Sequence, residues 1–229
     1  MARFQRGAFP SPRHRLAAAA PHVATTSTPA QWLWKPARLS MWLNDVDGDC
    51  VTAEEAFAKG CQPGVFITDD TVQAWATANN VLNGADLTTV LDLMQTAGFP
   101  SGDTTLDDGP PVSVDWTNAS LLQNAIAQGP VKIGVAADQL EATVESQPGN
   151  AWLAMGYQSD QNEDHCVSLC GYGTISWLAS QLGAEFTGEI ADTPAYAMFT
   201  WDSIGIIDEP SLLAICAEAW LRQPTTIQK

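Results

Sequence analysis

The chain has 229 residues and a mass of 24.5 kDa, which is enough for one domain or for two compact lobes that share an interface. Its 26 acidic and 10 basic residues give a formal net charge of −16, which argues against nucleic acid or an anionic membrane as the main partner. No apolar stretch approaches the roughly 20 residues that a membrane-spanning helix needs.

The chain carries five cysteines, which is an odd number. They do not form the paired Cys-x-x-Cys motifs of a zinc site. This usage indicates reduced thiols rather than a disulfide framework. We therefore predict no metal site and no cofactor. The basic N-terminus is not followed by the apolar region of a secretory signal, so we expect a cytoplasmic protein, or part of an assembly built in the cytoplasm.

Residues 1–36 are rich in Pro, Ala, Ser and Thr and show no helical or strand period. They predict an extended N-terminal arm that is either disordered or docked on the domain or on a partner, and such an arm offers a route to protein assembly. The domain itself is predicted over 37–229.

Helical signals dominate the next part of the chain. The turn-forming sequence Asn44–Asp49 precedes a predicted helix over Cys50–Lys59, which Gly60 ends. Cys50 therefore falls at the N-terminal end of a helix. Two further helices are predicted, over Thr71–Val81 after a Thr68 cap and over Asp86–Ala97.

Strand signals dominate the part that follows. A helix that opens at Asn118 and ends at Gly129 precedes alternating or apolar runs, which predict strands over Val131–Val135, His165–Tyr172 and Tyr196–Trp201. A short extra helix is expected over Trp177–Leu182, and Pro210–Arg222 has helical spacing. The pattern predicts an α+β protein with a mainly helical lobe (37–112), a mainly β lobe (113–209) and a C-terminal helix and tail (210–229).

Cys50 is the candidate nucleophile, because a helix N-terminus stabilises a thiolate and offers a backbone N–H to an oxyanion. A cysteine nucleophile also needs a base, and His165 lies at the start of a predicted strand. The segments around Cys50 and His165, the helix at 86–99 and the helix and strand over 118–135 stand in the same order as in the papain-like cysteine peptidases, which the chain resembles over about residues 38–208.

The resemblance implies a helical left lobe packed against an antiparallel, β-barrel-like right lobe, with the active-site cleft between them. It also implies that Asn44, six residues before Cys50, completes the oxyanion hole in place of the family's Gln. The family's orienting Asn has no counterpart in Thr200-Trp201-Asp202. We favour Asp202 as the residue that orients His165, with Thr200 as the alternative and Trp201 as a shield against water.

The acidic turn before Cys50 has a second interpretation. Asp45, Asp47 and Asp49 have the spacing of the first ligands of a calcium-binding EF-hand loop, but the glycine and the final glutamate of that loop are missing. A tight capped turn is favoured. Its negative charge should raise the pKa of the Cys50 thiol.

Two functions follow from the sequence. The first is a thiol-dependent hydrolase of peptides or other carbonyl substrates, in which Cys50 attacks, His165 transfers the proton, Asp202 orients His165, and Asn44 stabilises the oxyanion. The alternative is a catalytically inactive papain-like scaffold with a structural or binding role, which the acids around Cys50 and the missing orienting Asn favour. The turn before Cys50 also resembles, more softly, a motif in uncharacterised papain-like proteins of bacteria and phages, which implies a place for such a scaffold in a phage particle assembled in the cytoplasm.

Overall fold

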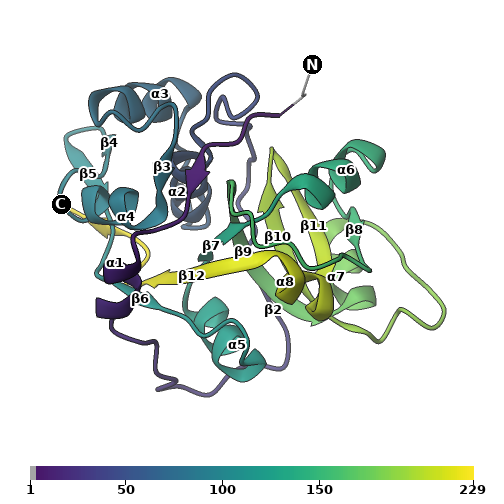
Figure 1. The fold of residues 1–229 in the computed structure, drawn as a ribbon. Coiled ribbons are helices and arrows are strands. Elements are labelled where there is room, and N and C mark those ends of the chain that lie inside the picture. The colour runs from purple at the N-terminus through teal and green to yellow at the C-terminus, as the bar shows by residue number, and fades with distance from the viewer. Residues whose placement is uncertain (1–3) are drawn as a thin grey trace.

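A lobe of helices packs against a lobe built on a β-sheet in the computed structural model, which describes residues 4–229 (Figure 1). The helical lobe contains three helices, α2 (Cys50–Gly60), α3 (Asp69–Ala78) and α4 (Leu87–Thr96). A small antiparallel sheet adjoins them, with β4 (Phe99–Ser101), β5 (Thr104–Asp107) and the C-terminal strand β13 (Ile227–Gln228).

The predicted capping residues begin their helices. The Thr68 Oγ1 atom accepts the Thr71 N–H at 3.3 Å, and Asp86 Oδ1 accepts the Thr89 N–H at 3.0 Å. Asn118 does the same for α5 (Ala119–Gln128). A short polar side chain that satisfies an unpaired N–H fixes where a helix starts. The three predicted helix starts are therefore confirmed to within a few residues.

The second lobe is built on an eight-stranded sheet in which most neighbours are antiparallel. Its strand order is β6 (Pro111–Ser113), β12 (Cys216–Arg222), β7 (Val131–Val135), β9 (His165–Thr174), β10 (Pro194–Thr200), β11 (Ser203–Asp208) and β8 (Leu153–Ala154), with β2 (Trp32–Leu33) also paired to β9. The lobe also contains α6 (Asp138–Ser146), α7 (Ile175–Leu182) and α8 (Glu209–Ile215). This arrangement is the predicted α+β fold.

Strand β9 separates the two hydrophobic cores. Cys166 and Cys170 on one face pack with the helical lobe, whereas Val167 and Leu169 on the other face pack inside the sheet lobe. Alternate side chains of a strand point to opposite faces, so one strand can serve both cores. His165, the first residue of β9, consequently lies where the two lobes meet.

The C-terminal tail differs from its prediction. The helix predicted over Pro210–Arg222 ends at Ile215, and Cys216–Arg222 forms β12 between β6 and β7. Six of its seven residues are buried. A short apolar run of this kind fits a buried strand as well as a helix, and its long-range pairing with β7 decides between them.

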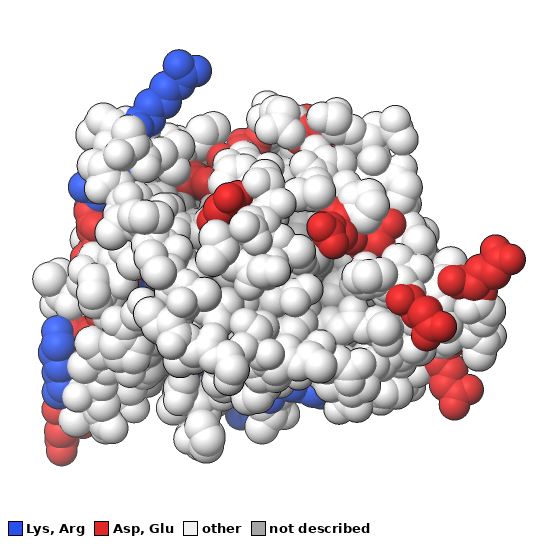
Figure 2. All heavy atoms as spheres, turned by 90° about the horizontal axis from the view of Figure 1, so that it is seen from below, with Lys and Arg blue, Asp and Glu red and all other residues white. Residues whose placement is uncertain are grey.

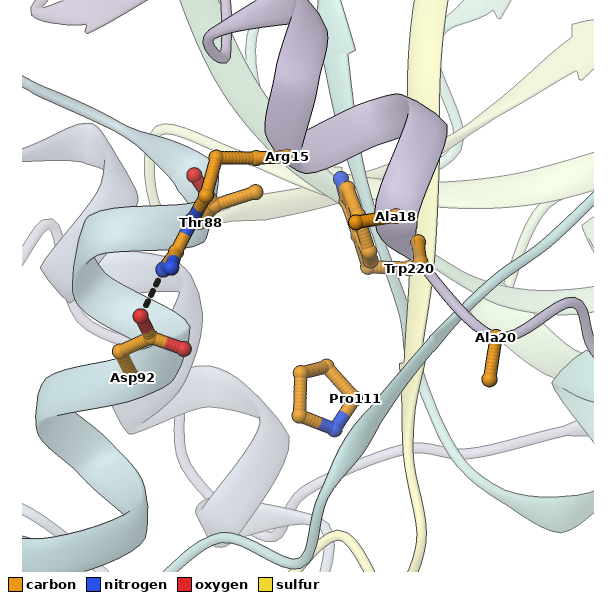
Figure 3. A pocket seen from close by; sticks show the side chains of 8 residues that line it. Arg15, Ala18, Ala20, Thr88, Asp92, Pro111 and Trp220 are labelled. Atoms are coloured by element: carbon orange, nitrogen blue, oxygen red, sulfur yellow. Dashed lines mark ion pairs between the residues drawn. The ribbon is translucent and has the colours of Figure 1, made fainter.

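The N-terminal arm lies on the domain along its described length. It contributes β1 (Ala8–Phe9), which pairs in parallel with β3 (Ala85–Asp86), and a short helix α1 (Arg13–Ala18) that the predicted extended arm did not include. Figure 3 shows Arg15 of α1 in an ion pair with Asp92 of α4. In Figure 1 the purple arm passes between the two lobes before it reaches α1.

No helix among the described residues is both long and apolar enough to cross a membrane.

Candidate active site

Cys50 is the first residue of α2 and is buried, with 1% of its surface exposed. Its sulfur accepts hydrogen bonds from the backbone N–H groups of Cys166 and Gly7. Burial raises the pKa of the Cys50 thiol to about 12, and the Asp49 charge adds to this rise. Cys50 is therefore a neutral thiol in this structure.

The ring of His165 is held on two sides. Its Nε2 atom lies 2.8 Å from Thr200 Oγ1, and the ring stacks on Trp201 with a centroid distance of 4.3 Å and an interplanar angle of 15°. The Nδ1 atom is buried without a hydrogen-bond partner among the described residues. Burial, with a contribution from the nearby Arg6 charge, lowers the pKa of His165 to about 3.

Thr200, rather than Asp202, contacts the ring nitrogen of His165, which corrects our preferred assignment. Thr200 and Ser203 are paired at the end of the β10–β11 hairpin. Trp201 and Asp202 form the turn between them, with φ angles of 42° and 62°. Asp202 is exposed in that turn. The two-residue turn thus puts Thr200 and Trp201, but not Asp202, against the imidazole.

Asn44 lies at the same junction and is buried. Its side-chain Nδ2 donates to the Asp47 carbonyl at 3.3 Å, so the amide is engaged in its own turn. Its backbone carbonyl accepts the Gln5 N–H at 2.9 Å. The structure brings Asn44 close to the site, although its side chain points to the turn and not to an open position.

The three acids of the turn before Cys50 differ in how deeply they are buried. Asp45 is exposed, Asp47 is partly buried, and Asp49 is buried with both carboxylate oxygens lacking a hydrogen-bond partner among the described residues. Burial, followed by repulsion from Asp47, raises the pKa of Asp49 to about 8. Residues 4–229 contain no group of three or more acidic, His or Cys side chains that could hold a metal ion.

Residues Phe4–Phe9, here called the cleft segment, lie across the candidate site and bond to both lobes. Besides the Gln5 bond to Asn44, the Ala8 N–H donates to the Asp164 carbonyl at 3.1 Å, and the Ala85 N–H donates to the Gly7 carbonyl at 2.9 Å. The cleft segment therefore closes the site from one lobe to the other.

Gly7 packs tightly against the turn that precedes Cys50. A Cβ atom on Gly7 would lie 1.7 Å from the Gly48 carbonyl oxygen, two residues before Cys50. The position is therefore restricted to glycine while the segment is seated. On one side of Gly7, Phe4 stacks on Trp201 with a centroid distance of 4.6 Å. On the other side, Ala8 and Phe9 pair with β3.

Solved cysteine proteases share this arrangement of lobes. The chain superposes on the Amb a 11 cysteine protease of ragweed pollen in its proform with a TM-score of 0.63 and 11% identity, over 92% of this chain and 72% of that one. It superposes on procathepsin L 3 of Tenebrio molitor with a TM-score of 0.62 and 13% identity, over 96% and 76% of the two chains. It superposes on xylellain, a cysteine protease from Xylella fastidiosa, with a TM-score of 0.62 and 10% identity, over 96% of both chains.

The chain has the papain-like fold. No family model matches the sequence, and no curated protein matches it. At 10–13% identity these likenesses describe the fold and leave the chemistry to the residues of the site.

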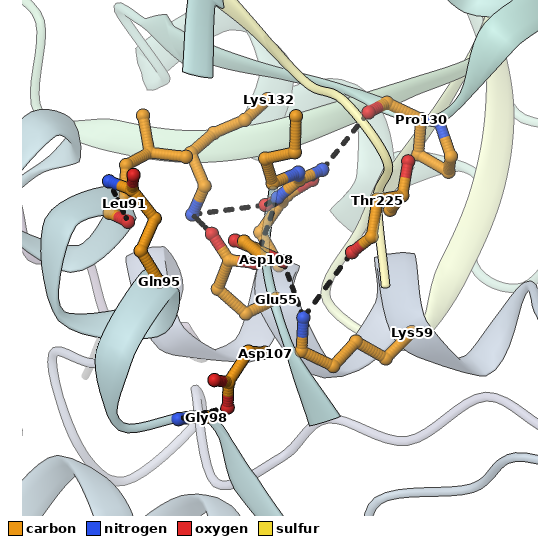
Figure 4. Close-up of polar contacts among 12 residues, drawn as sticks. Glu55, Lys59, Leu91, Gln95, Gly98, Asp107, Asp108, Pro130, Lys132 and Thr225 are labelled. Carbon is orange, nitrogen blue, oxygen red and sulfur yellow. Dashed lines mark hydrogen bonds and ion pairs between the residues drawn. The ribbon is translucent and has the colours of Figure 1, made fainter. Parts of the chain in front are cut away.

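In this papain-like fold a buried network of charges holds the helix that carries Cys50. All of α2 is buried, and Figure 4 shows its Glu55 and Lys59 facing charged groups of other elements. Lys132 of β7 pairs with Glu55 at 2.8 Å and also donates to the Val51 carbonyl at 2.7 Å. Three carboxylates are matched by three cations in the ion pairs Lys59–Asp108, Lys132–Glu54, Lys132–Glu55, Arg222–Glu54 and Arg222–Glu55.

Sequence reasoning offered a docked arm and named Thr200 as the alternative partner of His165, but it did not identify Phe4–Phe9 as the covering residues, and it missed the buried charge network. Phe4 and Phe9 were a signal, because aromatic residues around a glycine are unusual for a solvated arm. The acids and lysine of Cys50–Gly60 were another, since charged side chains in a helix between apolar neighbours need buried partners.

Proposed function

We propose that the chain is a thiol-dependent hydrolase of peptides or related carbonyl compounds, held in a closed state by its own cleft segment. One observation carries this proposal. Cys50 begins α2 beside the start of β9, where Thr200 and Trp201 fix the ring of His165 and leave its Nδ1 without a partner.

The chemistry needs one neutral imidazole and one thiol. With its proton on Nε2, His165 donates to Thr200 Oγ1 and keeps the lone pair of Nδ1 for the Cys50 proton. The sulfur then attacks the substrate carbonyl, and His165 returns the proton to the leaving amine. Water cleaves the resulting thioester by the same route in reverse order.

The oxyanion would be stabilised at the N-terminus of α2. The first N–H groups of a helix have no intrahelical partner and carry partial positive charge, so the Cys50 N–H is a natural donor. Asn44 supplies a second donor once its Nδ2 leaves the Asp47 carbonyl. Such donors act where negative charge develops in the transition state.

The cleft segment explains why neither reacting group is charged. A seated segment excludes water from Cys50 and His165, and desolvation disfavours both the thiolate and the imidazolium. The Arg6 charge further lowers the pKa of His165. Displacing the segment should lower the pKa of the Cys50 thiol and raise that of His165, so that the two move toward a reactive pair.

A second function, the inactive scaffold, is favoured by a specific observation. Asp49 lies beside Cys50 in the chain and raises the pKa of its thiol, and the imidazole is oriented by a neutral hydroxyl in place of an amide or carboxylate. If the thiol stays unreactive after the segment is displaced, the scaffold is the better description.

The test uses full-length Gly7→Val, whose side chain cannot fit against Gly48. We expect iodoacetamide to modify Cys50 at least tenfold faster at neutral pH than in the wild-type chain, as measured by mass spectrometry of the Cys50 peptide. Hydrolysis of a quenched casein substrate should appear with Gly7→Val and disappear when Cys50→Ala or His165→Ala is added.

Matched controls separate opening from misfolding. Ala17→Val places the same side chain at an exposed position of the arm and should leave Cys50 protected. The partly buried thiol of Cys61 is an internal reference whose modification rate should not change. Arg6→Glu, which opposes the seated segment by charge, is a second opening variant. Modification of Cys50 in both open variants at no more than the wild-type rate would contradict the hydrolase proposal.

A further inference from the structure

The guanidinium of Arg6 occupies a subsite made of three carboxylates. Its Nη1 atom lies 2.5 Å from Asp138 Oδ1 and 2.7 Å from Asp164 Oδ2, and its Nε atom donates to Glu141 Oε2 at 3.0 Å. The Nη2 atom donates to the same Glu141 oxygen. Four contacts from a planar cation to three acids make a specific arrangement and not a chance approach of surface charges.

The carboxylates are positioned by the fold. The second oxygen of Asp164 accepts the Ala137 N–H at 3.0 Å, which fixes that side chain to the residue before α6. Asp138 and Glu141 lie in the first turn of α6. Among residues 4–229, Arg6 is the only cation in ion-pair contact with these three acids. When the cleft segment leaves, we expect these acids to become available to another cation, with Asp164 still held by the Ala137 N–H.

The subsite lies on the His165 side of the thiol. Asp164 directly precedes His165, and Phe4, two residues before Arg6, stacks on the Trp201 ring that also covers His165. A general acid must reach the leaving amine, so the side of the site nearest His165 receives the residues after the scissile bond.

The direction of the cleft segment differs from the direction that cleavage requires. The side chains of Phe4 and Arg6 lie on the His165 side, whereas Ala8 and Phe9 run along β3, with the Ala8 N–H still bonded to the Asp164 carbonyl. A substrate must place its later residues on the His165 side. The cleft segment therefore uses the same subsites in reverse, which keeps its own peptide bonds from the reactive orientation.

We propose that Asp138, Glu141 and Asp164 form a subsite that selects peptides with arginine as the first residue after the scissile bond. The inference rests on the hydrolase function proposed above. Arginine is favoured over lysine because its planar guanidinium reaches Glu141 through two nitrogens while a third bridges Asp138 and Asp164. The net charge of −16 also attracts basic peptides.

Hydrolysis of paired peptides tests the selection. Internally quenched peptides that differ only by Arg, Lys or Gln after the cleaved bond are compared with full-length Gly7→Val. We expect kcat/KM for Arg to exceed that for Gln by about 10- to 100-fold, the range for hydrogen bonds to charged groups, with Lys in between. Adding Glu141→Gln should reduce the ratio, whereas Glu145→Gln, an exposed acid on the same helix, should preserve it.

A binding measurement tests the subsite without chemistry. Fluorescein-labelled Phe-Gln-Arg-Gly-Ala-Phe, the sequence of the cleft segment, and its Arg-to-Gln analogue are titrated into full-length Gly7→Val with Cys50→Ala, and fluorescence anisotropy is followed. We expect the Arg peptide to bind about 10- to 100-fold more tightly, and this difference to shrink with Glu141→Gln.

The two measurements separate the two proposals. Equal affinity for both labelled peptides, or cleavage of Arg and Gln substrates at equal kcat/KM, overturns the arginine subsite and leaves the hydrolase function intact. Arg-dependent binding without cleavage of any peptide supports the subsite and overturns the hydrolase.

Discussion

Thr200 is the residue whose role the hairpin geometry defines most sharply. It is buried, it lies 2.8 Å from His165 Nε2, and it precedes the ring that covers the imidazole. A hydroxyl can accept the Nε2 proton and so favour the tautomer in which Nδ1 is the base. In the proposed hydrolase, its role is to position His165 and not to touch substrate.

We therefore predict that Thr200→Val lowers kcat about fivefold in the Gly7→Val background, because a hydrogen bond of about 1 kcal/mol that orients the base is lost. Thr200→Ser, which keeps the hydroxyl, should retain most of the activity, and the pH profile of kcat should shift only with valine. The kcat of Asp202→Asn should be close to that of the parent Gly7→Val chain. The reverse order, with Asp202→Asn more harmful than Thr200→Val, would restore Asp202 as the orienting residue.

Asp49 makes the stability of the folded chain depend on pH. Its pKa is raised from 3.8 to about 8, chiefly by burial. The folded chain thus binds more protons at Asp49 than the unfolded chain between these values, and this group makes the free energy of unfolding decrease as pH rises. The slope from one such group is at most about 1.4 kcal/mol per pH unit.

Asp49→Asn should flatten that dependence and gain stability relative to the wild type between pH 5 and pH 8, as measured by urea unfolding at three pH values. Asp45→Asn, an exposed acid of the same turn, should keep the wild-type slope. Identical slopes for Asp49→Asn and the wild type would mean that Asp49 is ionised in the folded chain.

At the scale of elements, α2 is the part of the fold on which the site depends, and its charged residues fix it between the lobes. Glu55 is completely buried and contacts Lys132 at 2.8 Å and Arg222 at 3.0 Å. Opposite charges hold the pKa of Glu55 below its usual range despite its burial. Removing one partner leaves uncompensated cations in the interior.

We predict that Glu55→Gln lowers the free energy of unfolding by about 3–5 kcal/mol, measured by urea denaturation at pH 7. The matched comparison is Asp92→Asn, which breaks the exposed ion pair with Arg15 and should cost no more than about 1 kcal/mol. Losses of similar size in the two variants would show that the buried network contributes little beyond a surface pair.

Local sequence signals predicted some of the elements, whereas others depend on long-range contacts. Capping residues and apolar periodicity identified α2, α3, α4 and α5, because those signals act within one helical turn. The same rules failed for β12, whose strand state depends on pairing with residues about 80 positions away. They also missed α6, which carries two of the three acids around Arg6.

At the scale of the whole molecule, the two lobes and the arm form one functional arrangement. Both lobes supply candidate site residues at their junction, and the arm returns there to cover them. Figure 2 shows acidic side chains spread over one face among many uncharged residues. The acids on that face are dispersed, which suits a solvated surface that attracts basic ligands.

The sequence by itself determined the class of fold and the helix starts, because these follow from local periodicity, capping and the order of motifs, whereas the pairing of Cys50 with His165 stays a prediction. Only the tertiary structure decided that Thr200 contacts His165, that Phe4–Phe9 cover the candidate site, and that three acids gather around Arg6. Each of these depends on contacts between residues far apart in the chain, which strand register and lobe packing create and which no local pattern records.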